Sequence, residues 1–178
     1  MTVFWEHGYE ATSTDDLIRA MGIGRQSMYD AFGDKLRLYL EAFQLYEREA
    51  SAAFSALVAA ASSPFEAIRR HLDSVAEGTT DDRSRGCFLV NATTGSAPSD
   101  SAATEMVRAV SARCMTLFEG LLKEAKRLGE LDPSLDEHLV ANYLISTMNG
   151  LRVSAKAGVP PEDLRGIVSL ALSRLEPR

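Results

Sequence analysis

The sequence has few of the residue types that build metal sites, disulfide frameworks or membrane spans. Its 178 residues include two cysteines and three histidines, and none of these has the spacing of a metal-ligand motif. The longest apolar runs, such as Ala56 to Ala61, are far shorter than the roughly 20 residues that cross a bilayer. No charged and apolar leader opens the chain. We therefore expect a cytoplasmic protein with reduced cysteines, no metal, no cofactor and no membrane partner.

Motifs of the common enzyme classes are also missing. The sequence has no glycine-rich phosphate loop, no His-Glu-x-x-His pair and no local nucleophile motif, so we expect no enzymatic activity. No segment alternates in polarity as a half-buried strand would. The pattern therefore predicts an all-α protein with about nine helices.

Residues 13–32 contain two short helical patterns joined by a glycine turn. Ser13 or Thr14 can cap the first helix, and Asp16 follows Ser13 by three residues, as in a variant of the capping box. Gly22 comes just after the last apolar position, where a left-handed helix end favours glycine. The second pattern begins two or three residues later. Two such helices predict a helix-turn-helix, a unit whose second helix can enter the major groove of DNA.

The charge of this region is unusual for a DNA-binding protein. Residues 1–46 contain four basic and seven acidic side chains, a net charge of −3, and the whole chain has a net charge of −6. Faces that bind DNA are usually basic. Because the distribution of charge matters more than its sum, the acidity predicts weak nonspecific affinity for DNA and does not exclude DNA as a partner.

Several residues in the first 46 positions have the order and spacing of a known family. They are Phe4, Gly8-Tyr9, Ala11-Thr12-Ser13, Leu17-Ile18, Ala20 through Ile23, Tyr29, Phe32 and Lys35. In this order the region resembles the DNA-binding domain of the TetR family of bacterial transcriptional regulators. The resemblance implies a DNA-binding domain over residues 1–46, whose first helix is shortened, and a ligand-binding and dimerisation domain over residues 47–178.

The resemblance implies six DNA contacts, three to bases and three to phosphates. The positions at the start of the recognition helix, which contact bases, are Arg25, Gln26 and Ser27. The positions that contact phosphates are Thr14, Tyr29 and Lys35. Arginine suits guanine and glutamine suits adenine, whereas phosphate contacts set register and orientation. At Asp30 the chain departs from the aromatic or histidine residues frequent in the family, and an acid there would repel phosphate.

Partners and a mechanism are implied as well. The expected protein is a homodimer that binds partly palindromic double-stranded operator DNA, acts as a repressor, and is released by a small effector. The alternative function is an all-helical ligand carrier or enzyme that retains the helix-turn-helix as a scaffold.

Helical patterns continue beyond the first domain. Helices are expected over residues 34–61, 64–77, 87–94, 100–128, 135–157 and 161–175, with a polar loop over residues 78–85. The last two helices carry wide apolar stripes on more than one side, which indicates that other helices pack against them on two sides. From the residues alone, packing within one subunit explains these stripes as well as dimerisation does. The resemblance favours dimerisation.

Apolar and aromatic side chains of the middle helices are the candidate lining of an effector pocket. The set comprises Phe65, Ile68, Phe88, Asn91, Met115, Phe118, Leu122, Tyr143 and Met148. For any single one of them core packing is the commoner explanation, since cores and pockets share their composition, so they are proposed only as a set. No cluster of basic residues accompanies them, so the expected effector is a small apolar molecule. Cys87, close to Arg83 and Arg85, is either a sensor of oxidants or electrophiles or a small core residue.

Overall fold

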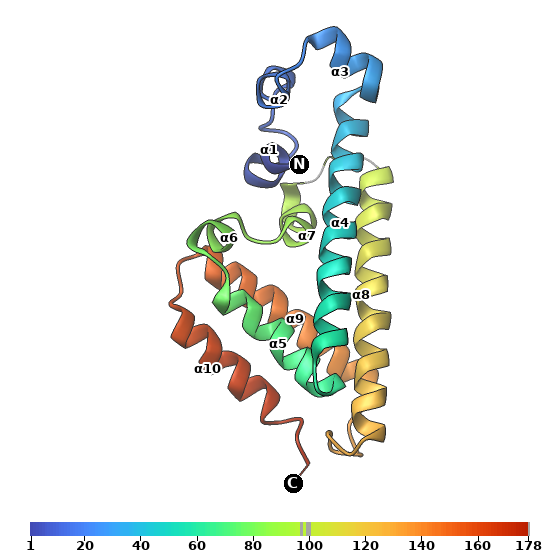
Figure 1. Cartoon of the computed structure of the whole chain (residues 1–178), viewed down its shortest axis with the longest axis vertical. Helices are drawn as coiled ribbons and strands as arrows, with labels where there is room; N and C mark the ends of the chain where they lie inside the picture. The colour runs from blue at the N-terminus through green and yellow to red at the C-terminus, as the bar shows by residue number, and fades with distance from the viewer. Residues whose placement is uncertain (97, 99–100, 178) are drawn as a thin grey trace. The chain divides into compact units, whose positions relative to one another are not determined.

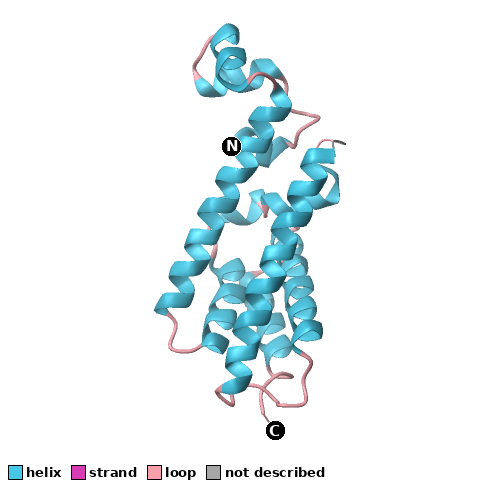
Figure 2. Ribbon diagram, turned by 90° about the vertical axis from the view of Figure 1, so that its right-hand side faces the viewer, coloured by secondary structure: helices cyan, strands magenta, loops and turns pink. Residues whose placement is uncertain are grey.

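Helices make up all of the regular structure that this computed structural model describes, over residues 1–96, 98 and 101–177 (Figure 1). Figure 2 shows helices and loops only, with no strand in these residues. The predicted all-α class is therefore confirmed. None of the helices in the described part of the chain has both the length and the apolar character that a membrane span requires.

The chain begins with three short helices and one long helix. They are α1 (Thr2–His7), α2 (Thr14–Met21), α3 (Arg25–Phe32) and α4 (Lys35–Ala60). Ser13 caps α2 as predicted: the Asp16 backbone N–H donates to Ser13 Oγ at 3.1 Å, and the Asp16 carboxylate accepts from the Ser13 N–H at 3.0 Å. Gly22 ends α2 in the left-handed conformation, with φ at 66°. The helix-turn-helix thus forms where the local signals predict it.

The later helices match the predicted pattern, with one addition. They are α5 (Pro64–Glu77), α6 (Thr80–Arg85), α7 (Phe88–Asn91), the π-helical turn η1 (Ala92–Ser96), α8 (Ser101–Arg127), α9 (Glu137–Lys156) and α10 (Pro161–Leu172). The prediction of a loop over residues 78–85 was wrong, because α6 lies there. Thr79 caps α6 by accepting from the Asp82 backbone N–H at 3.1 Å. The start predicted for α8, at residue 100, lies outside the described residues.

Two compact units divide the chain. The N-terminal unit comprises residues 1–51 and the described part of 87–109, and the C-terminal unit comprises residues 52–86 and 110–177. The predicted domains, 1–46 and 47–178, follow the chain order. In the structure, α7 and the beginning of α8 belong instead to the same unit as the helix-turn-helix.

The core of the N-terminal unit is a cluster of aromatic rings from α1, α4 and α7. Tyr39 lies at its centre, with ring centroids 5.2 Å from Phe4, 5.7 Å from Phe88 and 6.4 Å from Phe43. All four side chains are at most 1% exposed. Burial raises the pKa of Tyr39 to about 12. The edge-to-face ring pairs of this cluster pack α7 against α1 and α4.

The core of the C-terminal unit is formed by α5, α8, α9 and α10. Its fully buried side chains include Ile68, Leu72, Leu122, Leu144 and Leu164. The apolar stripes predicted for the last two helices therefore pack, in large part, within their own subunit.

Candidate nucleic-acid interface

The recognition helix α3 is held by one buried face and exposes the other. Met28 is fully buried and packs α3 against α2, whose Leu17 is 4% exposed. Gly24 precedes the first turn of α3 in an extended conformation, so this helix starts without a side-chain cap. Arg25 and Gln26, in that first turn, are both exposed. Because α3 is amphipathic, the side chains of its first turn are exposed to solvent while Met28 is buried.

The candidate base-contacting residues lie together, and acidic side chains hold two of them. Arg25 Nη2 donates to Asp15 Oδ1 of α2 at 2.5 Å. Gln26 Nε2 donates to Asp30 Oδ1, four residues later on α3, at 2.8 Å. Ser27 is exposed beside them. The sequence alone predicts neither acidic partner. The i,i+4 spacing of Gln26 and Asp30 was a usable signal, whereas no pattern along the chain pairs Arg25 with Asp15.

The candidate phosphate-contacting residues come from three helices. Thr14 is the first residue of α2, Lys35 is the first residue of α4, and Tyr29 on α3 is 40% exposed. The Lys35 ammonium lies 4.2 Å from the centroid of the Tyr9 ring. This cation–π contact restrains a long flexible side chain near the helix-turn-helix.

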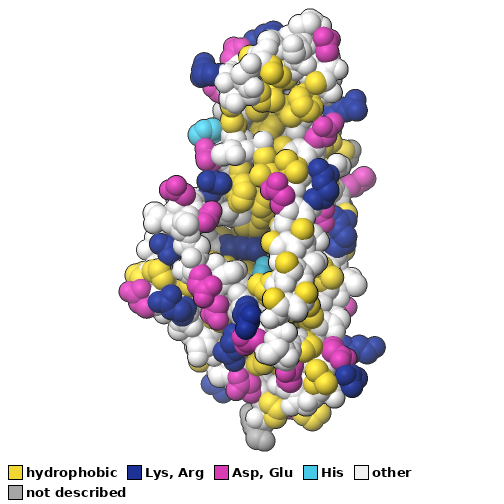
Figure 3. Space-filling view, viewed as in Figure 1, with side chains coloured by type: hydrophobic (Ala, Val, Ile, Leu, Met, Phe, Trp, Pro, Cys, Tyr) yellow, Lys and Arg dark blue, Asp and Glu magenta, His cyan; other side chains and the backbone are white. Residues whose placement is uncertain are grey.

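Charges of both signs cover the surface. On the face that Figure 3 shows, Lys and Arg side chains are interspersed with Asp and Glu and form no continuous basic surface. Binding by such a surface depends on a few well-placed cations more than on its overall field.

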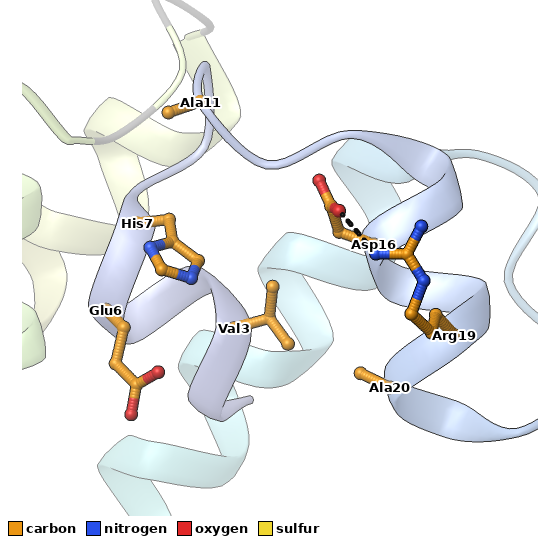
Figure 4. A pocket seen from close by; sticks show the side chains of 7 residues that line it. All are labelled: Val3, Glu6, His7, Ala11, Asp16, Arg19 and Ala20. Atoms are coloured by element: carbon orange, nitrogen blue, oxygen red, sulfur yellow. Dashed lines mark hydrogen bonds and ion pairs between the residues drawn. The ribbon is translucent and has the colours of Figure 1, made fainter.

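An open groove of about 690 Å³ lies between α1 and α2 (Figure 4). It is lined by Val3, Glu6, His7, Ala11, Asp16, Arg19 and Ala20. Asp16 and Arg19 form an ion pair across one turn of α2, at 3.4 Å. Hydrogen bonds from Ser13, first from its side chain and then from its backbone, lower the pKa of Asp16, and the charge of Arg19 adds to this. Because the polar residues include both signs, we do not assign the groove to the DNA backbone.

The nine candidate effector-binding residues divide between the two units. Five are buried in the C-terminal core, with Met115 packed against them; the five are Phe65, Ile68, Phe118, Leu122 and Met148. Phe88 and Asn91 lie instead in the N-terminal unit, where Phe88 joins the aromatic cluster and Asn91 Nδ2 donates to the Trp5 carbonyl at 3.4 Å. The sequence of a short apolar helix such as α7 does not indicate which of the two cores it packs in. The contact of Phe88 and Asn91 with an effector stays a prediction, separate from that of the other seven.

Tyr143 belongs to an exposed apolar surface on the last two helices. Leu139 (67% exposed), Tyr143 (42%) and Val153 (54%) lie on α9, and Ile167 (43%) and Leu170 (65%) lie on α10. We call these five residues the α9–α10 surface. Exposed apolar side chains concentrated on two helices are typical of a protein interface.

His71 is a polar group in the C-terminal unit that sequence analysis did not single out. It lies on α5 against the stacked rings of Phe54 and Phe118, with centroid distances of 4.6 and 6.0 Å. Burial, reinforced by the positive charge of Arg152, lowers its pKa to about 4. The signal was its place beside Leu72 in the apolar stripe of α5, where a histidine is expected to be buried.

The Cys87 thiol is buried. The residue is 5% exposed, and its Sγ lies 3.1 Å from the Tyr46 hydroxyl oxygen. Reaction with an oxidant or electrophile requires access to the thiol. The structure therefore gives the sensor hypothesis no support.

Two family models match the chain. The model described as "Bacterial regulatory proteins, tetR family" matches residues 1–42, and the one described as "Tetracyclin repressor-like, C-terminal domain" matches residues 64–167. The helix-turn-helix and most of the C-terminal unit are thus both covered.

Known relatives match along nearly the whole chain. The uncharacterized HTH-type transcriptional regulator YezE of Bacillus subtilis (strain 168) is 32% identical over 176 residues, which are 98% of this chain and 91% of that protein. The HTH-type transcriptional repressor ComR of Escherichia coli (strain K12) is 29% identical over 174 residues, which are 97% of this chain and 83% of that protein.

A solved structure of a TetR family regulator has the same fold. It is a cysteine mutant of CifR, complexed with 26-base-pair operator DNA. The TM-score is 0.86 and the identity 31%, over 98% of this chain and 91% of that one.

Proposed function

The chain belongs to the TetR family of bacterial transcriptional regulators, and from this premise we propose that it is an effector-responsive repressor that binds operator DNA as a homodimer. The observation that supports DNA binding most directly is the exposed first turn of α3. Arg25 and Gln26 project there from a helix whose opposite face is buried through Met28. In a symmetric dimer, two such helices would engage half-sites about one helical turn apart, roughly 34–36 Å.

Arg25→Ala tests the role of α3. We expect it to weaken binding to the selected operator by about 1–3 kcal/mol and to relax the preference at one base position. Arg48→Ala is the matched control, because Arg48 is an exposed arginine on α4 of the same unit and outside α3. Operators would be selected from random double-stranded oligonucleotides, and affinities measured by fluorescence anisotropy. Equal weakening of operator and random DNA by Arg25→Ala would contradict a base contact.

The α9–α10 surface is the proposed dimer interface. Its five apolar side chains are between 42% and 67% exposed in the single chain, and a partner subunit would bury them. Stable homodimer interfaces often bury more than about 2,000 Å² in total. Leu144 and Val168 lie on the same helices but face the core, at 0% and 2% exposed. Charged substitutions there would therefore unfold the subunit instead of separating the two subunits of a dimer.

Charge reversal on this surface tests the dimer. Leu139→Glu combined with Leu170→Glu should give a folded monomer in light scattering, whereas Leu128→Glu should remain dimeric. Leu128, which follows α8, is a matched control because it is 51% exposed and outside the surface. A wild-type chain that is monomeric at micromolar concentration would contradict the proposal.

The proposed effector site lies in the C-terminal unit among α5, α8 and α9. These helices contribute Phe65, Phe118 and Met148, and methionine adapts to ligands of irregular shape. A compound from a library of small apolar molecules should both raise the melting temperature and release operator DNA. A compound that does only one of the two would not be the effector, because a switch needs different affinities for the two states of the protein.

Repression and a cytoplasmic location complete the proposal. One relative is itself called a transcriptional repressor, and a regulator that binds bacterial chromosomal DNA works in the cytoplasm. Purified protein should reduce transcription from a template that contains the selected operator downstream of a promoter. Increased transcription would instead indicate an activator.

A further inference from the structure

Asp30 is the neighbour of Gln26 on the exposed face of α3. We propose that Asp30 is a positioning residue that fixes the orientation of the Gln26 amide and thereby gives Gln26 a preference for adenine over guanine. This inference rests on the proposed function of α3 as the recognition helix. Its basis is the hydrogen bond from Gln26 Nε2 to Asp30 Oδ1, at 2.8 Å.

A carboxylate beside a glutamine amide determines which end of the amide faces it. The carboxylate only accepts hydrogen bonds, so the NH₂ group of Gln26, not its oxygen, must face Asp30. A glutamine without such a neighbour can turn its amide over at little cost. Asp30 therefore selects one of two amide orientations before DNA arrives.

The selected orientation leaves Gln26 with a defined set of hydrogen-bonding groups. One of its two N–H groups is used by Asp30, so one N–H and the carbonyl oxygen remain. The major-groove edge of adenine offers an acceptor at N7 and a donor at N6, which this set matches. The edge of guanine offers two acceptors, N7 and O6, which call for two donors. With one N–H engaged by Asp30, Gln26 provides only one donor.

The charge of Asp30 has a second effect of a different kind. A carboxylate near the DNA surface repels phosphates of every sequence, and this repulsion is screened by salt. Removing Asp30 should therefore raise affinity for all DNA and at the same time lower the preference for adenine. The two effects can be separated, because loss of the charge raises the affinity for every DNA sequence whereas loss of the hydrogen bond lowers the ratio of affinities for adenine and guanine.

Three variants of the protein separate the hydrogen bond from the charge. Asp30→Ala removes both, whereas Asp30→Glu keeps a carboxylate that only accepts hydrogen bonds, at the same i,i+4 spacing from Gln26. Glu10→Ala is the control, because Glu10 is an exposed acid of the same unit that lies outside α2 and α3. Asp30 is exposed, and a single i,i+4 pair on a helix surface contributes little to stability, so these variants should fold.

The measurement is a ratio of affinities for adenine and guanine at one operator position. Operators would be selected with the wild-type protein from random double-stranded oligonucleotides, and the relevant position is the one whose preference is lost in Gln26→Ala. Because one bidentate contact discriminates by about 1–3 kcal/mol, we expect the wild type to prefer adenine there by roughly tenfold. In Asp30→Ala the ratio should fall below about threefold while binding to both sites tightens. Asp30→Glu should keep both the ratio and the weaker binding of the wild type.

Two results would overturn the inference, and a third would overturn the proposed function beneath it. If Asp30→Ala tightened binding to both sites equally, as Glu10→Ala is expected to do, the role of Asp30 would be electrostatic only. If Asp30→Glu lost the preference as fully as Asp30→Ala, an acceptor-only carboxylate at this position would not be its cause. If Gln26→Ala changed no base preference, or the wild type selected no sequence, α3 would not be a recognition helix contacting bases through Gln26.

Discussion

Mild acid should destabilise the protein through His71. This side chain lies on α5 against the rings of Phe54 and Phe118, and burial, reinforced by the charge of Arg152, lowers its pKa from 6.5 to about 4. The folded protein therefore holds His71 neutral over a pH range in which the unfolded chain binds a proton.

The direction and size of the effect follow from this difference. Below pH 6.5 the unfolded state takes up a proton at position 71, and the folded state does not until the pH approaches 4. The free energy of unfolding therefore falls as the pH drops through this window, and is unaffected by His71 above it. One pKa unit corresponds to about 1.4 kcal/mol, so the complete loss is about 3 kcal/mol, of which about 2 kcal/mol occurs between pH 7.5 and 5.

Urea unfolding of the wild type and His71→Phe at these two pH values tests the prediction. Phenylalanine preserves an aromatic ring against Phe54 and Phe118 and removes the titrating group. We expect the wild type to lose about 2 kcal/mol more than His71→Phe on acidification. All measurements need the same chain concentration, because dimerisation stabilises by mass action.

His138→Gln is the matched control, since His138 lies on α9 of the same unit and its side chain is 69% exposed. It should leave the acid sensitivity of the wild type in place. If the wild type and His71→Phe lost the same stability, His71 would not be buried as a neutral side chain, and its packing against Phe54 would need to be revised.

Two further predictions concern the helix-turn-helix. Ser13→Ala removes the acceptor for the Asp16 backbone N–H and should lower the free energy of unfolding by about 1 kcal/mol, whereas Ser13→Thr, which keeps the hydroxyl, should restore most of it; equal stability of wild type and Ser13→Ala in thermal melting would show that the cap is dispensable. Lys35→Ala should weaken binding to operator and random DNA alike and reduce the slope of log affinity against log salt by about 1, as expected for one lost phosphate contact. A loss confined to the operator would indicate that Lys35 contacts a base.

The parts of the fold that sequence analysis predicted correctly depend on local signals. The ends of α2 are set by Ser13 and Gly22, which act within one turn of their own position. The all-helical class followed from the 3.6-residue period of apolar side chains. The same local chemistry was present at α6, where Thr79 and Asp82 form a capping box. That helix was missed because its six residues include no apolar side chain, so the periodic pattern gave no signal.

The parts that could not be predicted depend on which elements meet in space. The pattern of α7 predicts a short buried helix and says nothing about which core receives it, so the packing of Phe88 in the N-terminal unit could not be predicted. The ion pair of Arg25 with Asp15 joins side chains ten positions apart across the turn, and no periodicity reports such a pair. The candidate DNA contacts followed from the resemblance to a family, whereas the acidic side chains that hold Arg25 and Gln26 required coordinates.

The aromatic cluster gives the protein a built-in optical probe. Trp5 is the only tryptophan of the chain, and its ring lies 4.9 Å from Tyr46 and 6.1 Å from Phe88 of α7. Its emission wavelength therefore reports the local polarity at the contact between α1 and α7, and excitation energy absorbed by Tyr46 reaches it over a few ångströms. Any rearrangement that withdraws α7 from this contact changes both signals, so the state of the DNA-binding unit can be followed in the unlabelled protein.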